Sequence, residues 1–394
     1  MLQNEIKGLA KEIAVKVIAD RRHLHANPEL SFKEFQTSAF IKTRLSEMGI
    51  SFQPMAGTGV LAIIKGEQSS ENVVALRADM DALPITELNK VDYASGTNGV
   101  MHACGHDVHT SSLLGTAFIL QSLKSKFGGT VKLIFQPGEE VLPGGASLMI
   151  KEGVLESPTP TAVIGQHVMP SLDRGKIGIR KGKYMASKDD LYITVHGKGG
   201  HGAQPHQNID PVLIAAHIII ALQQVVSRMA NPSMASVLSF GRVVADGSTN
   251  IIPDKVYIEG TLRTLDENWR IEAQQKIKKI ATGIAESMGG YCDVEIVTGY
   301  PFLINEEKLT GEVYGYAQEY VGENNVCDVD IWMAAEDFAY YSQVADACFY
   351  MLGTGNKEQN IISSLHTPTF NIDEDALSIS TGLMAYIAVK QLGN

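Results

Sequence analysis

Three apolar runs of this chain end in side chains that bind metals or carry protons, and these runs restrict the fold most strongly. They are VVALRADMDALP, which delivers Asp79 and Asp81, TVKLIFQPGEE, which delivers Glu139 and Glu140, and AVIGQHV, which delivers His167. Short, continuous apolar runs are typical of strands buried on both faces of a parallel sheet. In an open α/β sheet, the ligand crevice lies beyond the carboxyl ends of the strands. We therefore expect an α/β fold in which these side chains meet at one edge of a sheet.

The densest group of candidate metal ligands is the segment MHACGHDVHT, which holds three histidines, one cysteine and one aspartate in ten residues. His102, Cys104 and His106 alternate along it, so an extended segment would project all three to the same side. A thiolate among imidazoles favours a zinc-like ion. Each residue alone is more often a satisfied core group. The cluster, together with the carboxylates at the strand ends, predicts a metal site.

The pair Glu139 and Glu140 suggests a division of roles. Adjacent side chains do not readily point the same way, so we expect one carboxylate to bind metal while its neighbour acts as a general base on a water molecule. A solvated acidic turn is the alternative explanation for such a pair. That alternative must also explain why an apolar strand and a Pro-Gly precede the turn.

The composition is an ordinary soluble one, and it agrees with an enzyme. The chain has 394 residues, of which 44% are apolar and 20% charged, and this length predicts two domains. The formal net charge is −11. Nucleic-acid binding needs a basic stripe, which nothing in the chain supplies, so we expect no nucleic-acid partner.

Three features predict a cytoplasmic protein that does not enter a membrane. The amino terminus forms a charged amphipathic helix without the apolar core of a secretion signal. The most apolar stretch, VLIAAHIIIAL from Val212, is about half the roughly 20 residues that span a bilayer, and it predicts a buried helix. The four cysteines lack any paired spacing, as is usual in a reducing compartment.

The middle of the chain predicts a second, inserted domain. From Lys188 the pattern reads strand (DLYITVHG), helix (Pro211 to Ser227), strand (ASVLSFGRVV), strand (KVYIEGTLRTL), helix (Glu267 to Met288) and strand (YCDVEIVT). This βαββαβ order is that of a ferredoxin-like unit. We expect residues 186–296 to form it, inserted into a first domain made of residues 1–185 and 297–394.

Eight motifs give the chain a recognisable relationship. In order they are RRHLHANPELSFKE, RADMDALPI, MHACGHDVHT, QPGEE, GGHGAQPH, STNIIPD, AEDF and LHTP. Together they resemble the metal-dependent amidohydrolases of peptidase family M20, in the branch of the aminoacylases, hippurate hydrolases and indoleacetyl-amino-acid hydrolases. The match runs over nearly the whole chain. The resemblance implies a catalytic α/β sandwich domain with a mixed sheet and a dinuclear metal centre, and a lid domain that also forms a homodimer.

The resemblance also implies roles for individual residues of the first domain. Glu139 would be the general base that activates a metal-bound water. The metal ligands would be Cys104, His106, Glu140, His167 and His366. The implied cofactors are two divalent ions per subunit, with zinc, manganese, nickel and cobalt all open. The roles of Asp79, Asp81, His102 and His109 also stay open, since each could bind metal or orient a ligand histidine.

Three lid residues are candidates for contact with the substrate. By resemblance, His201 would reach the scissile carbonyl, and Asn250 and Arg263 would hold oxygens of the substrate. An arginine fork suits a free carboxylate, although a solvated strand arginine is the commoner case. For Asp337, at the start of a predicted helix, capping is a sufficient explanation.

The sequence thus predicts hydrolysis of the amide bond of N-acyl-L-amino acids. A carboxypeptidase or dipeptidase that uses the same centre is the nearest alternative. A metal- or ligand-binding protein without turnover is a third, against which Glu139 argues, because a pure binder needs no general base. The acyl group and the amino acid stay open.

Overall fold

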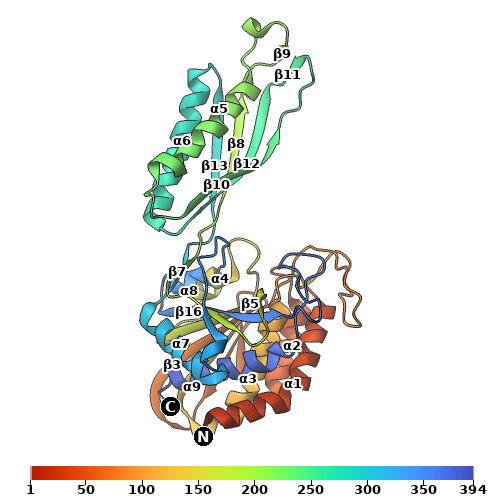
Figure 1. Ribbon diagram of the computed structural model, residues 1–394, viewed down its shortest axis with the longest axis vertical. Helices are drawn as coiled ribbons and strands as arrows, with labels where there is room; N and C mark the ends of the chain where they lie inside the picture. Colours follow the sequence, from red (N-terminus) through yellow and green to blue (C-terminus); the bar gives the residue numbers. More distant parts are fainter. Residues whose placement is uncertain (1, 394) are drawn as a thin grey trace. The chain divides into compact units, whose positions relative to one another are not determined.

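The computed structural model describes residues 2–393, which form two compact units (Figure 1). The first unit contains the chain up to Gly182, Ile304–Ile331 and the chain from Asp337 onward. The second contains Lys183–Leu303 and Trp332–Glu336. The chain enters the second unit after Gly182 and leaves it after Leu303, a few residues from the expected boundaries at 186 and 297. The return of Trp332–Glu336 to the second unit differs from the expectation, and the assignment of the two domains stays a prediction.

The first unit is built on an eight-stranded mixed sheet with the strand order β1-β2-β4-β3-β5-β16-β6-β15. Its strands are β1 (Ser51–Met55), β2 (Gly59–Lys65), β3 (Gln68–Asp79), β4 (Gly128–Gln136), β5 (Ala162–Asp173), β6 (Ile177–Ile179), β15 (Val326–Asp328) and β16 (Ala347–Gly355). Strands β4, β3, β5 and β16 run parallel to one another as neighbours. The three apolar runs therefore form adjacent parallel strands, as predicted.

The polar residues follow these strands with one difference from the expectation. Asp79 is the last residue of β3, and Glu139 and Glu140 lie just beyond the end of β4. His167 does not end its strand, because β5 continues to Asp173. The continuation keeps pairing with β16, whose Met351 lies opposite His167.

Helices pack against this sheet and against one another. They are α1 (Leu2–Ala26), α2 (Phe35–Glu47), α3 (His106–Ser122), α4 (Gly145–Lys151), α7 (Glu307–Val321), α8 (Ala339–Ser342) and α9 (Ala376–Gln391). The predicted amino-terminal helix is α1, which buries Ile6, Ala10, Ile13 and Val17 at helical spacing. These residues join α3, α9 and the sheet in one apolar core. The start of α3 is thereby held rigidly beside the carboxyl ends of the central strands.

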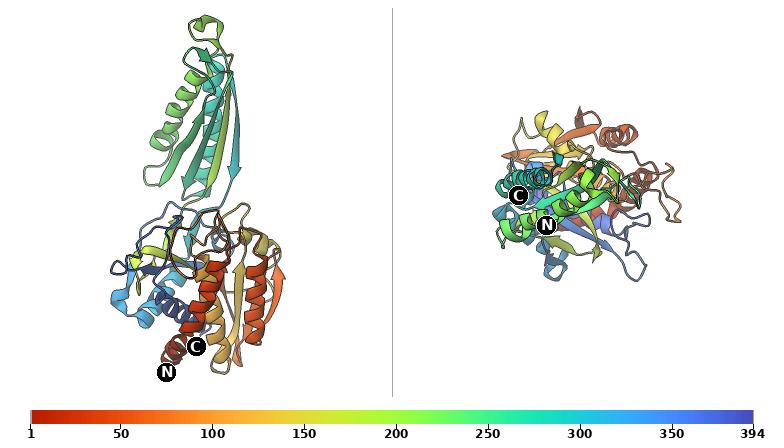
Figure 2. Two further views of the ribbon diagram at one scale, coloured as in Figure 1. Left: turned by 90° about the vertical axis from the view of Figure 1, so that its right-hand side faces the viewer. Right: turned by 90° about the horizontal axis from the view of Figure 1, so that it is seen from above.

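The second unit has the ferredoxin-like arrangement that the sequence predicts. Its antiparallel sheet has the order β10-β12-β8-β13. Its main elements are β8 (Asp189–His196), α5 (Pro211–Gln224), β10 (Ser236–Val244), β12 (Lys255–Thr264), α6 (Glu267–Ser287) and β13 (Tyr291–Thr298). Helices α5 and α6 cover one face of the sheet (Figure 2). The short strands β9 (Gly200–His201) and β11 (Ile251–Ile252) pair separately, while β7 (Gly182–Met185) and β14 (Leu303–Asn305) lie where the chain passes between units.

Helix α5 differs from the buried helix that its composition predicts. It buries Ile214, Ile218 and Leu222 but leaves Leu213 51% and Ile220 72% exposed. With the π-helical segment Val225–Met229 that follows, Pro211–Met229 is long and apolar enough to cross a membrane by length and composition alone. A core helix of a globular protein passes the same test, and here one side of the helix packs on the sheet. The exposed apolar side is a feature of the surface of the second unit.

Candidate metal centre

The segment Met101–Thr110 brings two of its three alternating residues to one place. It is not the extended segment that would project all three to one side, because Gly105 has a φ of 84° and α3 begins at His106. A Cβ atom on Gly105 would lie 2.5 Å from Cγ2 of Val168, so the turn needs glycine. Cys104 and His106 face a common group with His167. His102 is buried elsewhere, and neither of its ring nitrogens has a hydrogen-bond partner among the described residues.

The five residues predicted as metal ligands lie close together in the first unit. The thiol Sγ of Cys104 is 3.4 Å from Nε2 of His167 and 3.2 Å from Nε2 of His366. Oε1 of Glu140 is 3.5 Å from Nε2 of His366 and 3.9 Å from Nε2 of His106. Overlapping groups of these side chains have ligand atoms within 4.8 Å of one another. Such spacing suits atoms that share an ion.

The side chains of this group fit a divalent metal ion in their chemistry and in their unpaired atoms. Nε2 of His106 and Oε1 of Glu140 are buried, and neither has a hydrogen-bond partner among the described residues. Buried polar atoms are nearly always paired, so two orphans that face a thiol and other imidazoles point to a ligand. Thiol, imidazole and carboxylate donors together suit borderline divalent metals such as zinc.

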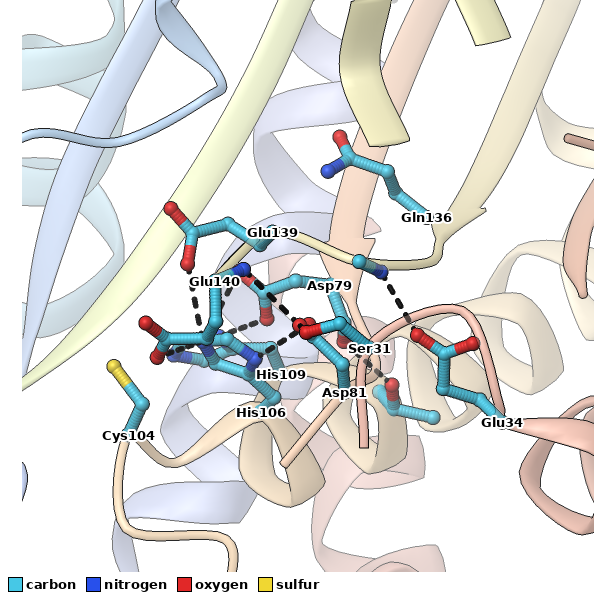
Figure 3. Close-up of polar contacts among 12 residues, drawn as sticks. Ser31, Glu34, Asp79, Asp81, Cys104, His106, His109, Gln136, Glu139 and Glu140 are labelled. Atoms are coloured by element: carbon cyan, nitrogen blue, oxygen red, sulfur yellow. Dashed lines mark hydrogen bonds and ion pairs between the residues drawn. The ribbon is translucent and has the colours of Figure 1, made fainter. Parts of the chain in front are cut away.

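Glu139 and Glu140 both reach this group, contrary to the expectation that neighbours diverge. Their nearest carboxylate oxygens lie 4.0 Å and 3.9 Å from Nε2 of His106. Both residues lie in a bend after β4, where the alternation of a strand no longer applies. Oε1 of Glu139 also accepts a hydrogen bond of 3.3 Å from the backbone N–H of Asp337. Figure 3 shows both carboxylates beside His106 and Cys104.

Neighbouring groups fix the orientation of the histidines. Nδ1 of His106 lies 3.1 Å from Oδ1 of Asp81, which leaves Nε2 facing the glutamates. Nδ1 of His167 lies 2.8 Å from the carbonyl of Val168, which leaves its Nε2 facing Cys104. Partners of this kind are typical of metal-binding histidines. Asp81 therefore contacts a candidate ligand rather than standing in the ligand groups itself.

His366 reaches the group through strained backbone. Its φ is 59°, in the left-handed region that residues with a side chain rarely adopt. The backbone N–H of His366 donates to the carbonyl of Ala103 at 2.9 Å, which fixes it beside Cys104. Strain of this kind persists where the surrounding structure holds it, often at functional sites.

The electrostatics of the group favour a bound cation. Burial alone would lower the pKa of His106, but Asp79, Asp81 and Glu140 outweigh it and raise the pKa to about 10. Burial and the charges of Glu140 and Glu139 raise the pKa of the Cys104 thiol well above its usual value. The raised pKa of His106, and the part of the Cys104 shift that comes from the glutamates, reflect concentrated negative charge, which a divalent ion would compensate.

A second set of buried charges lies beside the candidate ligands. Arg77 is fully buried and bonds Oδ2 of Asp79 at 2.6 Å, Oδ1 of Asp337 at 2.7 Å and Oε1 of Gln136 at 2.9 Å. The explanation of Asp337 as a helix cap is wrong, since α8 begins at Ala339 without a side-chain cap. Asp337 instead binds Arg77 and Gln136. Arg77 is a charged residue inside an apolar strand, and such a residue suggests a buried carboxylate as its partner.

Helix α1 anchors the first turn of α3 through another buried group. Nε of Arg21 donates to Oδ2 of Asp107 at 2.8 Å, and Nδ1 of His25 lies 2.7 Å from the same oxygen. Burial would raise the pKa of Asp107, but Arg21 and His25 outweigh it and lower the pKa far below its usual value. This contact gives the RRHLH part of the first motif a structural role.

The three predicted substrate residues lie in the second unit. His201 and Asn250 are exposed neighbours, because β9 pairs with β11 and the N–H of Gly202 donates to the carbonyl of Asn250 at 2.9 Å. Arg263 lies near the other end of β12, opposite Val237. It is half-buried, its Nε donates to Oγ1 of Thr261 at 3.1 Å, and burial lowers its pKa. The structure thus brings two of the three together.

Comparisons with known proteins agree with the motifs. The sequence profile of Peptidase family M20/M25/M40 matches residues 75–390. An N-acyl-L-amino acid amidohydrolase of Geobacillus stearothermophilus is 45% identical over 309 residues, which are 78% of this chain and 83% of the relative. Thermostable carboxypeptidase 2 of Saccharolobus solfataricus is 38% identical over 393 residues, which are 99% and 98% of the two chains.

A solved structure extends this likeness to three dimensions. The crystal structure of a dinuclear metal-binding peptidase of the M20 family from Bacillus subtilis matches with a TM-score of 0.83 and 35% identity, covering 97% of this chain and 99% of that one. The family profile, which matches residues 75–390, includes every candidate ligand described above. The chain therefore belongs to peptidase family M20/M25/M40 and is a metal-dependent amide hydrolase.

Proposed function

We propose that the protein hydrolyses the amide bond of N-acyl-L-amino acids to a carboxylic acid and a free amino acid, with Glu139 as the general base. The observation that carries the proposal is the convergence of the Glu139 and Glu140 carboxylates on Nε2 of His106, beside the thiol of Cys104. The amidohydrolase of Geobacillus stearothermophilus supports this choice of substrate class.

In this proposal the metal ligands are the five residues that the motifs indicate. They are Cys104, His106, Glu140, His167 and His366. Five ligands in overlapping groups support two ions per subunit, as in the dinuclear peptidase of Bacillus subtilis. When bound, divalent ions supply Lewis-acid polarisation of a carbonyl and lower the pKa of a water molecule. Zinc, manganese, nickel and cobalt all suit the mixture of donors, with the thiol favouring zinc.

Glu139 performs the proton transfers. Glu139 is 5% exposed and its carboxylate accepts the backbone N–H of Asp337, so it is largely shielded from bulk water. It takes the proton of the attacking water as the new C–O bond forms. It then returns that proton to the amine as the C–N bond breaks, so the carboxylate is regenerated. General acid–base catalysis of this kind contributes about 10²- to 10⁴-fold in rate.

The second unit supplies residues that recognise the substrate. His201 would stabilise the developing negative charge on the carbonyl oxygen, and its exposure on β9 leaves it open to a ligand. Asn250 and Arg263 would hold the oxygens of the substrate, with the guanidinium suited to the free α-carboxylate. In the same proposal, residues 186–296 are the lid and dimerisation domain.

The protein would act as a cytoplasmic homodimer. The exposed apolar side of α5, with Leu213 and Ile220, and the open edge strand β10 support a self-association surface on the second unit. The four free cysteines suit a reducing compartment.

Carboxypeptidase or dipeptidase action is the second candidate, because the thermostable carboxypeptidase matches over nearly its full length. A panel of N-acetyl, N-benzoyl and indoleacetyl amino acids beside dipeptides, with release of free amine as the readout, separates the two. We expect the metal-loaded protein to release amine from acyl-amino acids with the higher kcat/KM. Faster release from dipeptides would favour the second candidate, and no release from any member would contradict both.

A further inference from the structure

The segment Glu29–Glu34, between α1 and α2, has no role in the reaction described so far. It lies directly against the loops that carry the candidate ligands. The carbonyl of Glu29 accepts the N–H of Ala82 at 2.8 Å, and Leu30 forms a parallel bridge with Ala82. The segment therefore runs alongside the residues that follow β3. Its side chains are close enough to contact Asp81 there and the loop Pro137–Glu140 that follows β4.

Ser31 donates to the carboxylate of Asp81. That carboxylate contacts the ring of His106 and the backbone N–H of Glu140, two of the candidate metal ligands. The hydroxyl of Ser31 donates to Oδ2 of Asp81 at 2.6 Å. The same oxygen accepts the backbone N–H of Glu140 at 3.0 Å, while Oδ1 faces Nδ1 of His106 at 3.1 Å. Asp81 thus links the ring of one candidate ligand to the backbone of the next, and Ser31 fixes the rotation of Asp81.

Glu34 holds the loop Pro137–Glu140 at Gly138, as Asp81 holds it at Glu140. Glu34 is fully buried, and its Oε1 accepts the backbone N–H groups of Phe32 and Gly138, each at 2.8 Å. Its Oε2 accepts the hydroxyl of Thr58 at 2.6 Å. A buried carboxylate is expensive to desolvate unless such bonds satisfy it, so this position is not one that packing alone would fill with glutamate.

Gly138 fits this contact closely. Its φ is 58°, and a Cβ atom there would lie 2.4 Å from ring atoms of Phe32. Phe32 itself has a φ of 63°. The loop Pro137–Glu140 and the segment Phe32–Glu34 are therefore shaped to one another. Figure 3 shows Glu34 beside this loop and Ser31 beside Asp81.

We propose that Ser31 and Glu34 are positioning residues of the hydrolytic site, which set the placement of Glu139 and Glu140 through Asp81 and Gly138. The inference rests on the proposed function, in which these two glutamates are the base and a metal ligand. Misplacement of reacting groups by about 1 Å can cost 10²-fold in rate. Loss of the groups that orient metal ligands typically lowers metal affinity 10- to 100-fold.

The test uses three variants of the full chain. Glu34→Ala removes the carboxylate that accepts the backbone N–H groups of Phe32 and Gly138, and Ser31→Ala removes one hydroxyl. Glu34→Gln keeps an oxygen for Phe32 and Gly138, and its amide can donate to the hydroxyl of Thr58. For Glu34→Ala and Ser31→Ala we expect kcat to fall about 10- to 100-fold, KM to stay close to the wild-type value and zinc affinity to fall 10- to 100-fold in titrations of the metal-free protein. Glu34→Gln should recover most of both losses.

Glu29→Gln is the matched control, because it lies in the same segment but serves another purpose. The Glu29 carboxylate accepts the N–H of Thr37 at 2.8 Å and that of Gln36 at 3.1 Å, in the first turn of α2. This variant should lower the thermal midpoint only, with kcat and zinc affinity unchanged. Values of kcat and zinc affinity for Ser31→Ala and Glu34→Ala that match the control would overturn the proposal. Ser31→Ala decides the question alone where Glu34→Ala does not fold.

A double variant separates this proposal from the proposed function. Glu34→Ala should reduce kcat much less in a Glu139→Ala background than in the wild type, since a missing base cannot be misplaced. Equal losses in the two backgrounds would show that Glu34 does not act through Glu139. Full turnover by Glu139→Ala would instead remove the proposed function, whatever the Glu34 variants do.

Discussion

Nδ1 of His109 lies 2.6 Å from Oδ1 of Asp79, and the opposite ring nitrogen of His109 accepts the N–H of Val168 at 3.0 Å. The second bond leaves the proton on Nδ1, so His109 donates to the carboxylate. Burial would raise the pKa of Asp79, but His106, His109 and Arg77 outweigh it and lower the pKa well below its usual value. Asp79 is therefore an ionised link between Arg77 and the strand that carries His167.

Replacing Asp79 by asparagine should destabilise the first unit strongly. The change leaves the fully buried Arg77 with one charged partner fewer, and breaking a buried ion pair typically lowers the free energy of unfolding by about 3 kcal/mol or more. Urea unfolding followed by circular dichroism measures the loss. Asp293→Asn, which breaks the exposed pair with His196, should change the free energy of unfolding by less than about 1 kcal/mol. Equal effects of the two variants would contradict this account of Asp79.

Replacing Cys104 by serine should alter metal preference. The thiolate is the softest donor in the group, and soft donors favour zinc over manganese. We expect the affinity for zinc to fall more than the affinity for manganese, as measured by competition with a coloured chelator. Cys292→Ser, in β13 of the second unit, is the control and should leave both affinities unchanged. Parallel losses for the two metals would argue that the thiol does not bind them.

His102 should make the protein less stable in mild acid. Burial lowers its pKa from 6.5 to about 4, so between these values the unfolded chain binds a proton that the folded chain does not. The free energy of unfolding is therefore unaffected by protonation of His102 above pH 6.5. It falls by up to about 3 kcal/mol as the pH falls towards 4. His102→Leu should remove this part of the acid sensitivity in urea unfolding of the metal-free protein. An unchanged pH dependence in the variant would contradict the assignment.

The surface of α5 supports a test of the proposed dimer. Ile220→Glu places a charge on a side chain that is 72% exposed, so the monomer should still fold while an apolar interface would not form. We expect sedimentation to show a dimer for the wild type and a monomer for this variant. Val15→Glu, on the 79% exposed Val15 of α1, should remain dimeric. A monomeric wild type would contradict the proposed assembly.

Much of the fold follows from local patterns. Continuous apolar runs predict β3, β4 and β5, because strands covered on both faces need no polar alternation. The βαββαβ order predicts the second unit, because each element has its own periodicity. The buried face of α5 is less predictable, because an apolar residue such as Ile220 can cover either the core or an interface.

In the candidate site, too, some residues can be predicted from the sequence, and other features depend on the fold. Residues such as Cys104, His106 and Glu140 are visible in the sequence because their chemistry is unusual for loops and strand ends. The contacts of Ser31 with Asp81, across 50 positions, and of Arg77 with Asp337, across 260, depend on the three-dimensional arrangement alone. The alternating histidines do not predict the start of α3 at His106, since they fit an extended segment and Gly105 alone does not specify the left-handed turn before the helix.

The most direct test of the account is turnover of an N-acyl-L-amino acid by metal-loaded Glu139→Gln, with bound metal measured in the same sample. The glutamine keeps the size of the side chain but cannot take a proton from water. We expect unchanged metal content and a fall in kcat of about 10²- to 10⁴-fold. Turnover at the wild-type rate with full metal content would contradict the role of Glu139, and with it the central claim.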